Sequence, residues 1–195
     1  MFKKVLISDD LGSINKGVLT VLKGLKINNV QQVQYCDDAH LKIKKAALDN
    51  SPYDLLITDL SFVKDHREQK YPSGEALIIA LKQEYPELKI IVYSVEDRLQ
   101  RVRSLINTYH TNGYVCKGRR GLLELEEAIH TVYNNNTYLS PLVQQALSPK
   151  TELEIDDYDI ELVHLLANGL SQEEISVSLK KKNITPNSLS SIEKN

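Results

Sequence analysis

Short apolar runs alternate with segments of helical periodicity through the first two-thirds of the sequence, and this alternation constrains the fold most. Five runs are expected to be strands: residues 4–8, 30–36, 54–59, 90–94 and 113–117. At least three of them are continuously apolar, which is typical of strands buried on both faces of a parallel sheet. The segments between them have a helical period. Strict alternation of five strand–helix units therefore predicts an α/β fold with a doubly wound, five-stranded parallel sheet.

The region after the last of these helices has the composition of a connection. Three asparagines at 134–136 end the helical pattern, and Ser-Pro pairs follow at 140–141 and 148–149. We interpret residues 136–152 as a linker that contains one helical turn at 142–147. The first domain is accordingly expected to span residues 1–135.

Residues 153–195 are expected to form a small all-α domain. Three short helical patterns cover residues 158–167, 172–179 and 186–194. Ser171 with Glu174 predicts a capping box at the start of the second helix. Thr185 and Pro186 supply a cap and a first-turn proline for the third.

The numbers and positions of the cysteines and histidines indicate the cellular compartment of the protein and argue against some kinds of site. Cys36 and Cys116 are too few for a disulfide framework and indicate a reduced, cytoplasmic setting, with both expected in the cores of strands. No apolar run could span a membrane, and the opening MFKKVLISDD lacks a secretory signal's apolar stretch. The five histidines are scattered, which argues against a zinc site.

Polar side chains with complementary chemistry stand at the ends of the predicted strands. Asp9 and Asp10 follow the first strand, Asp59 ends the third, Ser94 the fourth and Lys117 the fifth. Because the carboxyl ends of parallel strands meet at one edge of a sheet, we expect these groups to converge. Three neighbouring carboxylates repel one another, and a divalent cation such as Mg²⁺ relieves that repulsion.

This set of groups suits phosphoryl transfer onto a carboxylate. Such transfer needs a carboxylate nucleophile, an acidic metal pocket, a cation and a hydroxyl, and all four are present. The alternative for any single residue is structural: Asp10, for example, also suits the N-cap of the helix that follows it. The arrangement as a whole favours the functional interpretation.

The segments VLISDD, LLITDL, IIVYS and GYVCKG, in that order, resemble the four signature segments of the response-regulator receiver domain, over about the first 135 residues. The resemblance implies a flavodoxin-like sheet and a signalling protein, not an enzyme, although slow self-phosphorylation from small donors and slow autodephosphorylation are compatible with it. It implies that Asp59 is the phosphoacceptor and that Asp10 binds Mg²⁺ directly. Asp9 would act through a metal-bound water, and the backbone carbonyl of Ser61 would complete the protein's ligands.

The same resemblance implies a switch. Ser94 would be the switching hydroxyl, Lys117 the phosphate-binding lysine and Tyr114 the aromatic switch residue, although strand packing accounts for Tyr114 equally well. Phosphorylation by a sensor histidine kinase would draw Ser94 and Lys117 inward and repack the face of the fourth helix and fifth strand. The family's loop after the phosphoacceptor is usually shorter than residues 61–73, which suggests that this loop shades the site or recognises a partner.

The segments GLSQEEIS and ITPNSLSSIEKN resemble the helix-turn-helix of LuxR/NarL-type regulators. The family's fourth helix has no counterpart before Asn195, so we expect an incomplete module. The implied core is Leu162, Leu165, Leu166, Ile175, Leu179, Ile184, Leu189 and Ile192. The implied DNA-binding residues are Lys180, Lys181 and Lys182 for phosphates, and Asn187, Ser188, Ser191 and Lys194 for bases.

The leading hypothesis is therefore a transcriptional response regulator that forms a homodimer on phosphorylation, with a histidine kinase and DNA as partners and no membrane association. The charge distribution opposes DNA binding, because residues 153–195 carry four lysines against eight acids, or −4, while the whole chain is −2. The alternative is a phosphorylation-switched protein-interaction module without DNA binding. A hydrolase that uses Asp59 as a covalent nucleophile is a third hypothesis, which lacks a general acid–base two residues after Asp59.

Overall fold

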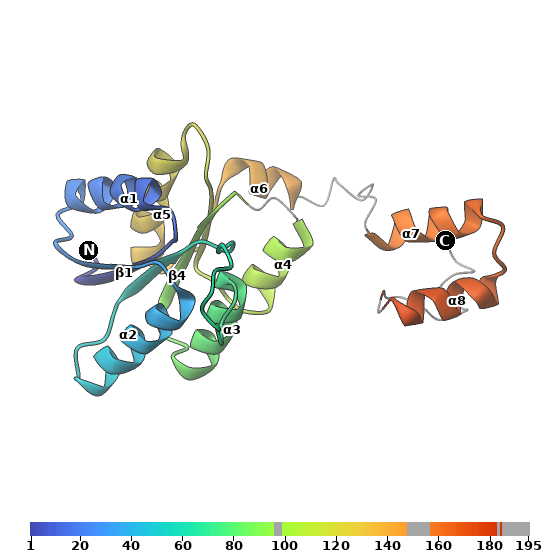
Figure 1. Cartoon of the computed structure of the whole chain (residues 1–195). Coiled ribbons are helices and arrows are strands. Elements are labelled where there is room, and N and C mark those ends of the chain that lie inside the picture. Colours follow the sequence, from blue (N-terminus) through green and yellow to red (C-terminus); the bar gives the residue numbers. More distant parts are fainter. Residues whose placement is uncertain (96–98, 148–156, 183, 185–195) are drawn as a thin grey trace. The chain divides into compact units, whose positions relative to one another are not determined.

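Six parallel strands form one sheet within the unit Met1–Ser148, in the order β2-β1-β3-β4-β5-β6 (Figure 1). The structure, a computed structural model, describes residues 1–95, 99–147, 157–182 and 184. The strands are β1 Lys4–Ser8, β2 Asn29–Val33, β3 Leu55–Thr58, β4 Lys89–Ser94, β5 Gly113–Cys116 and β6 Tyr138–Leu139. Since β1 lies between β2 and β3, the strand order reverses there, and the carboxyl ends of β1 and β3 border the crevice where such sheets bind ligands.

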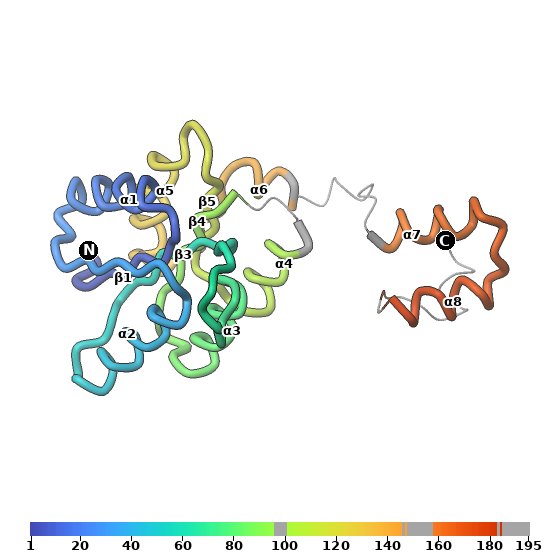
Figure 2. The backbone as a smooth tube through the Cα atoms, in the orientation of Figure 1, coloured from blue at the N-terminus to red at the C-terminus, as the bar shows by residue number. Residues whose placement is uncertain are grey.

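Helices cover both faces of this sheet, as the predicted doubly wound fold requires. On one face α1 Gly12–Gly24 and α5 Gly121–Tyr133 lie side by side (Figure 2). The opposite face carries α2 Cys36–Leu48, α3 Gly74–Glu84 and α4 Leu99–Asn107. The predicted α/β fold class is thus confirmed.

The alternation of side chains along each strand divides the core in two. In β1, Leu6 packs into the cluster beneath α2, α3 and α4, whereas Val5 and Ile7 pack into the cluster beneath α1 and α5. All three side chains are almost completely buried. This double burial explains why the strand sequences are continuously apolar.

The sheet has one strand more than predicted. β6 pairs in parallel with β5, and α6 Pro141–Ala146 follows it and packs against α4 and β5, in the region expected to be a linker. Ser140 connects the two elements to the core: its buried hydroxyl accepts a hydrogen bond from the Cys116 amide at 2.9 Å and donates one to the Glu124 carboxylate at 2.5 Å. Such a short strand, held through partners that are distant in the sequence, has little periodicity of its own.

The observed element boundaries differ most from the predicted ones around β2. This strand ends at Val33 and α2 begins at Cys36, whereas the strand was expected to continue to residue 36. Cys36 is therefore a buried helical residue, which corrects its assignment to a strand. Cys116 ends β5, as expected.

The unit Pro149–Asn195 contains α7 Asp157–Ala167 and α8 Gln172–Lys181 among its described residues. The predicted capping box is present, because the Ser171 hydroxyl accepts from the Glu174 amide while the Glu174 side chain accepts from the Ser171 amide. The buried cluster comprises Tyr158, Leu162, Leu165, Ile175 and Leu179, with Leu170 and Ile184 packed against it.

For one residue of this unit the predicted burial is wrong. Leu166 is 52% exposed and does not belong to the buried cluster of this unit. Tyr158, which the sequence analysis did not place in the core, is buried instead. Leu189, Ile192 and the third helical pattern, 186–194, lie outside the described residues.

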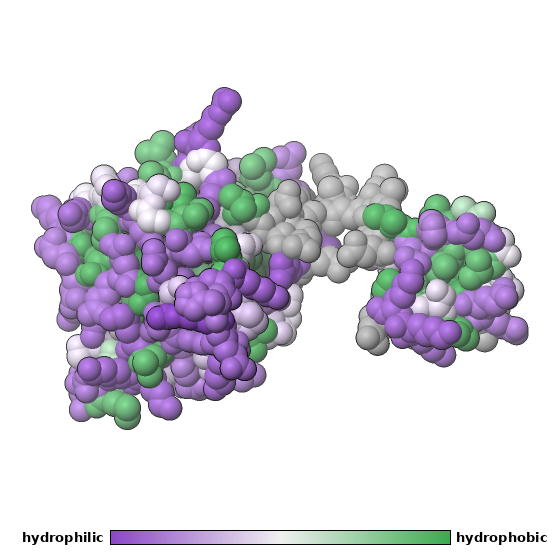
Figure 3. All heavy atoms as spheres, viewed as in Figure 1, coloured by the Kyte–Doolittle hydropathy of each residue, from purple (hydrophilic) through white to green (hydrophobic). Residues whose placement is uncertain are grey.

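Among the described helices, none combines the length and the apolar character needed to cross a membrane. Figure 3 shows mostly hydrophilic side chains over the visible face of the first unit, with hydrophobic ones scattered between them. The cytoplasmic setting stays a prediction.

Candidate functional site

The two strands at the reversal of strand order bring three carboxylates together. Ser8 pairs with Thr58 at the ends of β1 and β3, so Asp9 and Asp59 follow at the same level of the sheet. One oxygen each of Asp9, Asp10 and Asp59 lies within 4.8 Å of the others. The predicted acidic cluster therefore exists at the carboxyl edge of the sheet.

Asp59 is buried, with only 5% of the residue exposed, and both of its carboxylate oxygens accept hydrogen bonds. Its Oδ1 accepts from the Ser94 hydroxyl at 2.6 Å and from the backbone amides of Leu60 and Ser61 at 2.6 and 3.3 Å. Its Oδ2 accepts from Lys117 Nζ at 2.5 Å. These donors compensate for the burial of the charge and fix the orientation of both oxygens.

Lys117 bridges two of the carboxylates. Its Nζ lies 2.6 Å from Asp9 Oδ2 and 2.5 Å from Asp59 Oδ2, and its side chain is only 8% exposed. The backbone positions it, since the Lys117 amide donates to the Ser94 carbonyl at 2.8 Å where β4 and β5 end. The aromatic ring of Tyr93 lies 5.6 Å from the ammonium and adds a second favourable contact.

The environment of Asp9 differs from that of an exposed carboxylate. Burial raises the pKa of Asp9, and this effect outweighs the hydrogen bonds from Lys117 and from the Leu11 amide, which lower it. The backbone carbonyl of Asp9 accepts from the Asn15 side-chain amide at 2.8 Å, which fastens the residue to α1. Asp9 is thus held rigidly in a site that favours a cation beside it.

Only glycine fits at position 74, where the start of α3 lies against the backbone of Asp59. A Cβ on Gly74 would lie 1.8 Å from the Asp59 carbonyl oxygen and 2.9 Å from Leu60 Cα. The Gly74 amide also donates to the Leu60 carbonyl at 3.0 Å, which draws the start of α3 against the end of β3. No other amino acid fits this approach without displacing the backbone of the site.

The acidic cluster has the donor set that Mg²⁺ prefers. Asp9, Asp10 and Asp59 offer only carboxylate oxygens, which are hard ligands, and the half-buried Asp10 leaves the cluster open on one side. Asp10 Oδ2 also accepts a hydrogen bond from the Val63 amide at 2.8 Å. For Ser61 the structure gives an amide contact to Asp59, while the ligand role of its carbonyl stays a prediction.

The two predicted switch residues occupy different surroundings. Ser94 is fully buried and in direct contact with Asp59. Tyr114 is fully buried in β5, within the cluster that contains Val102 and Leu105 of α4. The role of Tyr114 as a switch stays a prediction.

The predicted DNA contacts can be located only in part. Lys180, Lys181 and Lys182 are exposed near the end of α8, but Lys182 Nζ lies 2.7 Å from the Glu161 carboxylate of α7. One of the three charges is thus already paired within the unit. Asn187, Ser188, Ser191 and Lys194 lie outside the described residues.

Sequence reasoning missed the residues that support the pocket from outside it. Tyr35 and Asp37, at the start of α2, bind the loop 61–73, and Tyr93 lies beside Lys117. The only available signal was the acidic pair Asp37–Asp38 after the second strand, which resembles an ordinary acidic first turn of a helix.

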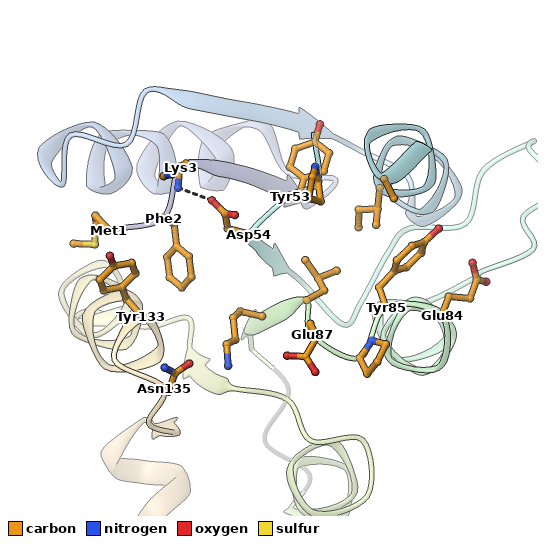
Figure 4. Close-up of a pocket in the computed structure, with 16 residues that line it drawn as sticks. Met1, Phe2, Lys3, Tyr53, Asp54, Glu84, Tyr85, Glu87, Tyr133 and Asn135 are labelled. Atoms are coloured by element: carbon orange, nitrogen blue, oxygen red, sulfur yellow. Dashed lines mark hydrogen bonds between the residues drawn. The ribbon is translucent and has the colours of Figure 1, made fainter. Parts of the chain in front are cut away.

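A cavity lies away from these residues. It has a volume of about 700 Å³ and lies at the amino ends of β1, β3 and β4, bordered by Phe2, Tyr53, Tyr85 and Tyr133 (Figure 4). On one side of it the Lys3 amide donates to the Asp54 carboxylate at 2.6 Å. None of the predicted phosphorylation residues lines this cavity, so it does not support the phosphoryl-transfer chemistry.

No family model and no curated protein matches the sequence. Solved structures of RcsB do match. A structure of two RcsB dimers bound to two parallel DNAs is 26% identical, with a TM-score of 0.64 over 98% of this chain and 88% of that one. A complex of the two-component response regulator RcsB with DNA is 24% identical, with a TM-score of 0.64 and the same coverage.

The isolated REC domain of RcsB from Salmonella enterica serovar Typhimurium, solved with the phosphomimetic BeF₃⁻, matches the first part of the chain. It is 23% identical, with a TM-score of 0.59 over 75% of this chain and 99% of that one. The resemblance to response regulators with a receiver domain is confirmed, and the coverage of the DNA complexes extends it into the second unit.

Proposed function

We propose that this chain is a response regulator of a two-component system that takes a phosphoryl group on Asp59 and controls transcription by binding DNA. One observation carries the proposal: Asp59 accepts hydrogen bonds from both Ser94 and Lys117 beside two further carboxylates. These are the groups that acyl phosphate formation needs. The similarity to RcsB, solved in complex with DNA, supports the second half of the proposal.

Phosphorylation would proceed by displacement at phosphorus. A carboxylate oxygen of Asp59 attacks the phosphoryl group, the bond from phosphorus to the donor's leaving group breaks, and the leaving group keeps the electron pair. Lys117 and Ser94, which hold the two Asp59 oxygens before transfer, then donate to phosphoryl oxygens. Mg²⁺ held by Asp9, Asp10 and Asp59 would neutralise phosphoryl charge.

The charge of the phosphoryl group would act on the rest of the domain through Ser94 and Tyr114. Ser94 leaves the carboxylate for the phosphoryl group, and the cluster around Tyr114, Val102 and Leu105 repacks. This rearrangement would alter the surface of α4 and β5 and promote a homodimer. A sensor histidine kinase is the proposed phosphoryl donor.

The test of the phosphoacceptor is labelling from acetyl phosphate with Mg²⁺. Wild type is expected to gain one acid-stable, base-labile phosphoryl group, and Asp59→Asn to gain none. Asp49→Asn, which changes an exposed carboxylate at the end of α2 in the same way, serves as the control and should label normally. Chelation of Mg²⁺ should abolish labelling of wild type. Persistent labelling of Asp59→Asn would refute the proposal.

A second candidate has one observation in its favour. The −4 charge of residues 153–195 and the Lys182–Glu161 pair leave few free cations, which suits a protein-interaction module without DNA binding. Gel-shift titrations with promoter fragments at two salt concentrations separate the candidates. Salt-sensitive binding by the phosphorylated protein supports transcriptional control, and no binding by either form supports the interaction module.

A further inference from the structure

The loop of residues 61–73, between β3 and α3, is closed at its base. The Gly74 amide donates to the Leu60 carbonyl at 3.0 Å, so the two ends of the loop lie side by side. A loop with adjacent ends and internal contacts of this length is an Ω-type loop, a class that is compact and frequently functional. Its start contacts Asp10 after β1, and its middle and its end both contact the β2–α2 junction.

The start of the loop contacts the acidic cluster. The Val63 amide donates to Asp10 Oδ2 at 2.8 Å, while the Val63 side chain is 74% exposed. The contact is therefore made by the backbone and depends on where the loop lies, not on the side chain at position 63. Within the described part of the chain, this is the one hydrogen bond that fixes the Asp10 carboxylate.

The end of the loop is held by α2. The Asp37 carboxylate accepts from two successive loop amides, Lys70 at 2.9 Å and Tyr71 at 2.8 Å, with one oxygen for each. The Tyr71 ring is buried and packs 4.8 Å from the ring of His40 on the same helix. Two charge-assisted hydrogen bonds and a buried ring anchor this end.

The middle of the loop is held by Tyr35, which immediately precedes α2. The Tyr35 hydroxyl donates to Asp65 Oδ2 at 2.6 Å, and Asp65 Oδ1 accepts from the Arg67 amide at 2.8 Å. The Arg67 guanidinium stacks 4.2 Å above the Tyr35 ring and lies 3.7 Å from the Asp38 carboxylate. The loop is thus fastened at two points to the β2–α2 junction.

We propose that Tyr35 and Asp37 are positioning residues for Asp10: they fix the loop so that the Val63 N–H orients this carboxylate for the cation. The inference rests on the proposed function. Neither residue touches the acidic cluster, and their effect passes through the loop backbone. Without the Val63 hydrogen bond, repulsion from Asp9 and Asp59 would turn the Asp10 carboxylate away from the cluster. Partners that orient a metal ligand in this way commonly change metal affinity by about 10- to 100-fold.

The test is a titration of the full chain with Mg²⁺ in the absence of a phosphoryl donor. Binding is measured from the change in backbone amide chemical shifts in NMR spectra. We expect Asp37→Ala to weaken Mg²⁺ binding about 10-fold and Tyr35→Phe, which keeps the ring beneath Arg67, by about 3-fold. Asp37→Asn retains one acceptor oxygen and should restore part of the loss. In each weakened variant the Val63 amide should also exchange faster with solvent.

The matched control is Glu68→Gln, which removes the same charge from an exposed position in the same loop and should leave Mg²⁺ binding unchanged. If Asp37→Ala fails to fold, Tyr35→Phe decides the question. Mg²⁺ binding equal to wild type in a folded variant whose Val63 amide has lost protection would overturn the inference. A wild-type protein that neither binds Mg²⁺ nor accepts phosphate would instead refute the proposed function, whatever the variants do.

Discussion

The carboxyl edge of the first unit and the α7–α8 unit place their charges in opposite ways. At the edge, Lys117 is almost buried between Asp9 and Asp59, and each partner is held by further hydrogen bonds. On α8 the lysines are exposed, and in the ion pair between Lys182 and Glu161 the lysine side chain is 52% exposed. Buried charges are locked in one geometry and strongly coupled to folding, whereas exposed ones contribute mainly to the surrounding field.

The largest expected contrast comes from two glycines. Gly74→Ala places a methyl group 1.8 Å from the Asp59 carbonyl oxygen, so the backbone of the site must move, and we expect a loss of about 4 kcal/mol in the free energy of unfolding. Gly169→Ala, in the turn before α8, meets no atom but must keep a φ of +74°, which costs about 1 kcal/mol. Urea denaturation of the whole chain, followed separately for each unit, measures both.

Equal losses in the free energy of unfolding for the two variants would contradict the close approach of Gly74 to the Asp59 backbone. Phosphorylation provides a second readout, because Gly74→Ala should also abolish labelling of Asp59, while Gly169→Ala should leave it unchanged.

The same substitution at a buried and an exposed lysine tests the comparison directly. Lys117→Met leaves Asp9 and Asp59 without their shared cation, and we expect a loss of about 3 kcal/mol in chelator, part of which Mg²⁺ restores. Lys180→Met on α8 should change stability by less than about 0.5 kcal/mol. Chemical denaturation with and without Mg²⁺ checks both variants. A Lys117→Met protein as stable as wild type in chelator would mean that the pocket tolerates unpaired carboxylates.

The raised pKa of Asp9 predicts a pH dependence confined to the first unit. Because the folded protein binds this proton more tightly than the unfolded chain, the stabilisation is present below the ordinary pKa of 3.8 and is lost as pH rises through the raised value. Asp9→Asn cannot titrate there, so its free energy of unfolding should fall less than that of wild type between about pH 4 and 7. Denaturation in chelator across this range gives the measurement, and parallel curves for the two proteins would contradict the expectation.

The smallest expected effect concerns the exposed pair on the second unit. Glu161→Gln removes the partner of Lys182 and one negative charge, so we expect DNA binding about two- to three-fold tighter at low salt, a gain that disappears at high salt. Glu173→Gln, the same charge change in the first turn of α8, is the control and should have less effect, because no lysine is released. Gel shifts at two salt concentrations distinguish them. A gain that is insensitive to salt would argue against this electrostatic explanation.

Much of the first unit was predictable because its signals are local and periodic. Five of the six strands and the position of the acidic cluster followed from apolar runs that end in Asp9, Asp59, Ser94 and Lys117. The sixth strand did not, since β6 is defined by pairing with β5 and not by its own composition. In the second unit the capping box at Ser171 was readable for the same reason, whereas the exposure of Leu166 and the burial of Tyr158 were not.

The sequence by itself determined the sheet, its strand ends and the chemistry collected there, because periodicity and strand-end residues act through neighbours along the chain. Only the tertiary structure decided how that chemistry is held: that Lys117 bridges Asp9 and Asp59, and that the loop 61–73 is fastened to Tyr35 and Asp37. These contacts join residues that are distant in the sequence. Their geometry depends on how helices and loops pack on the finished sheet, and no local pattern encodes that packing.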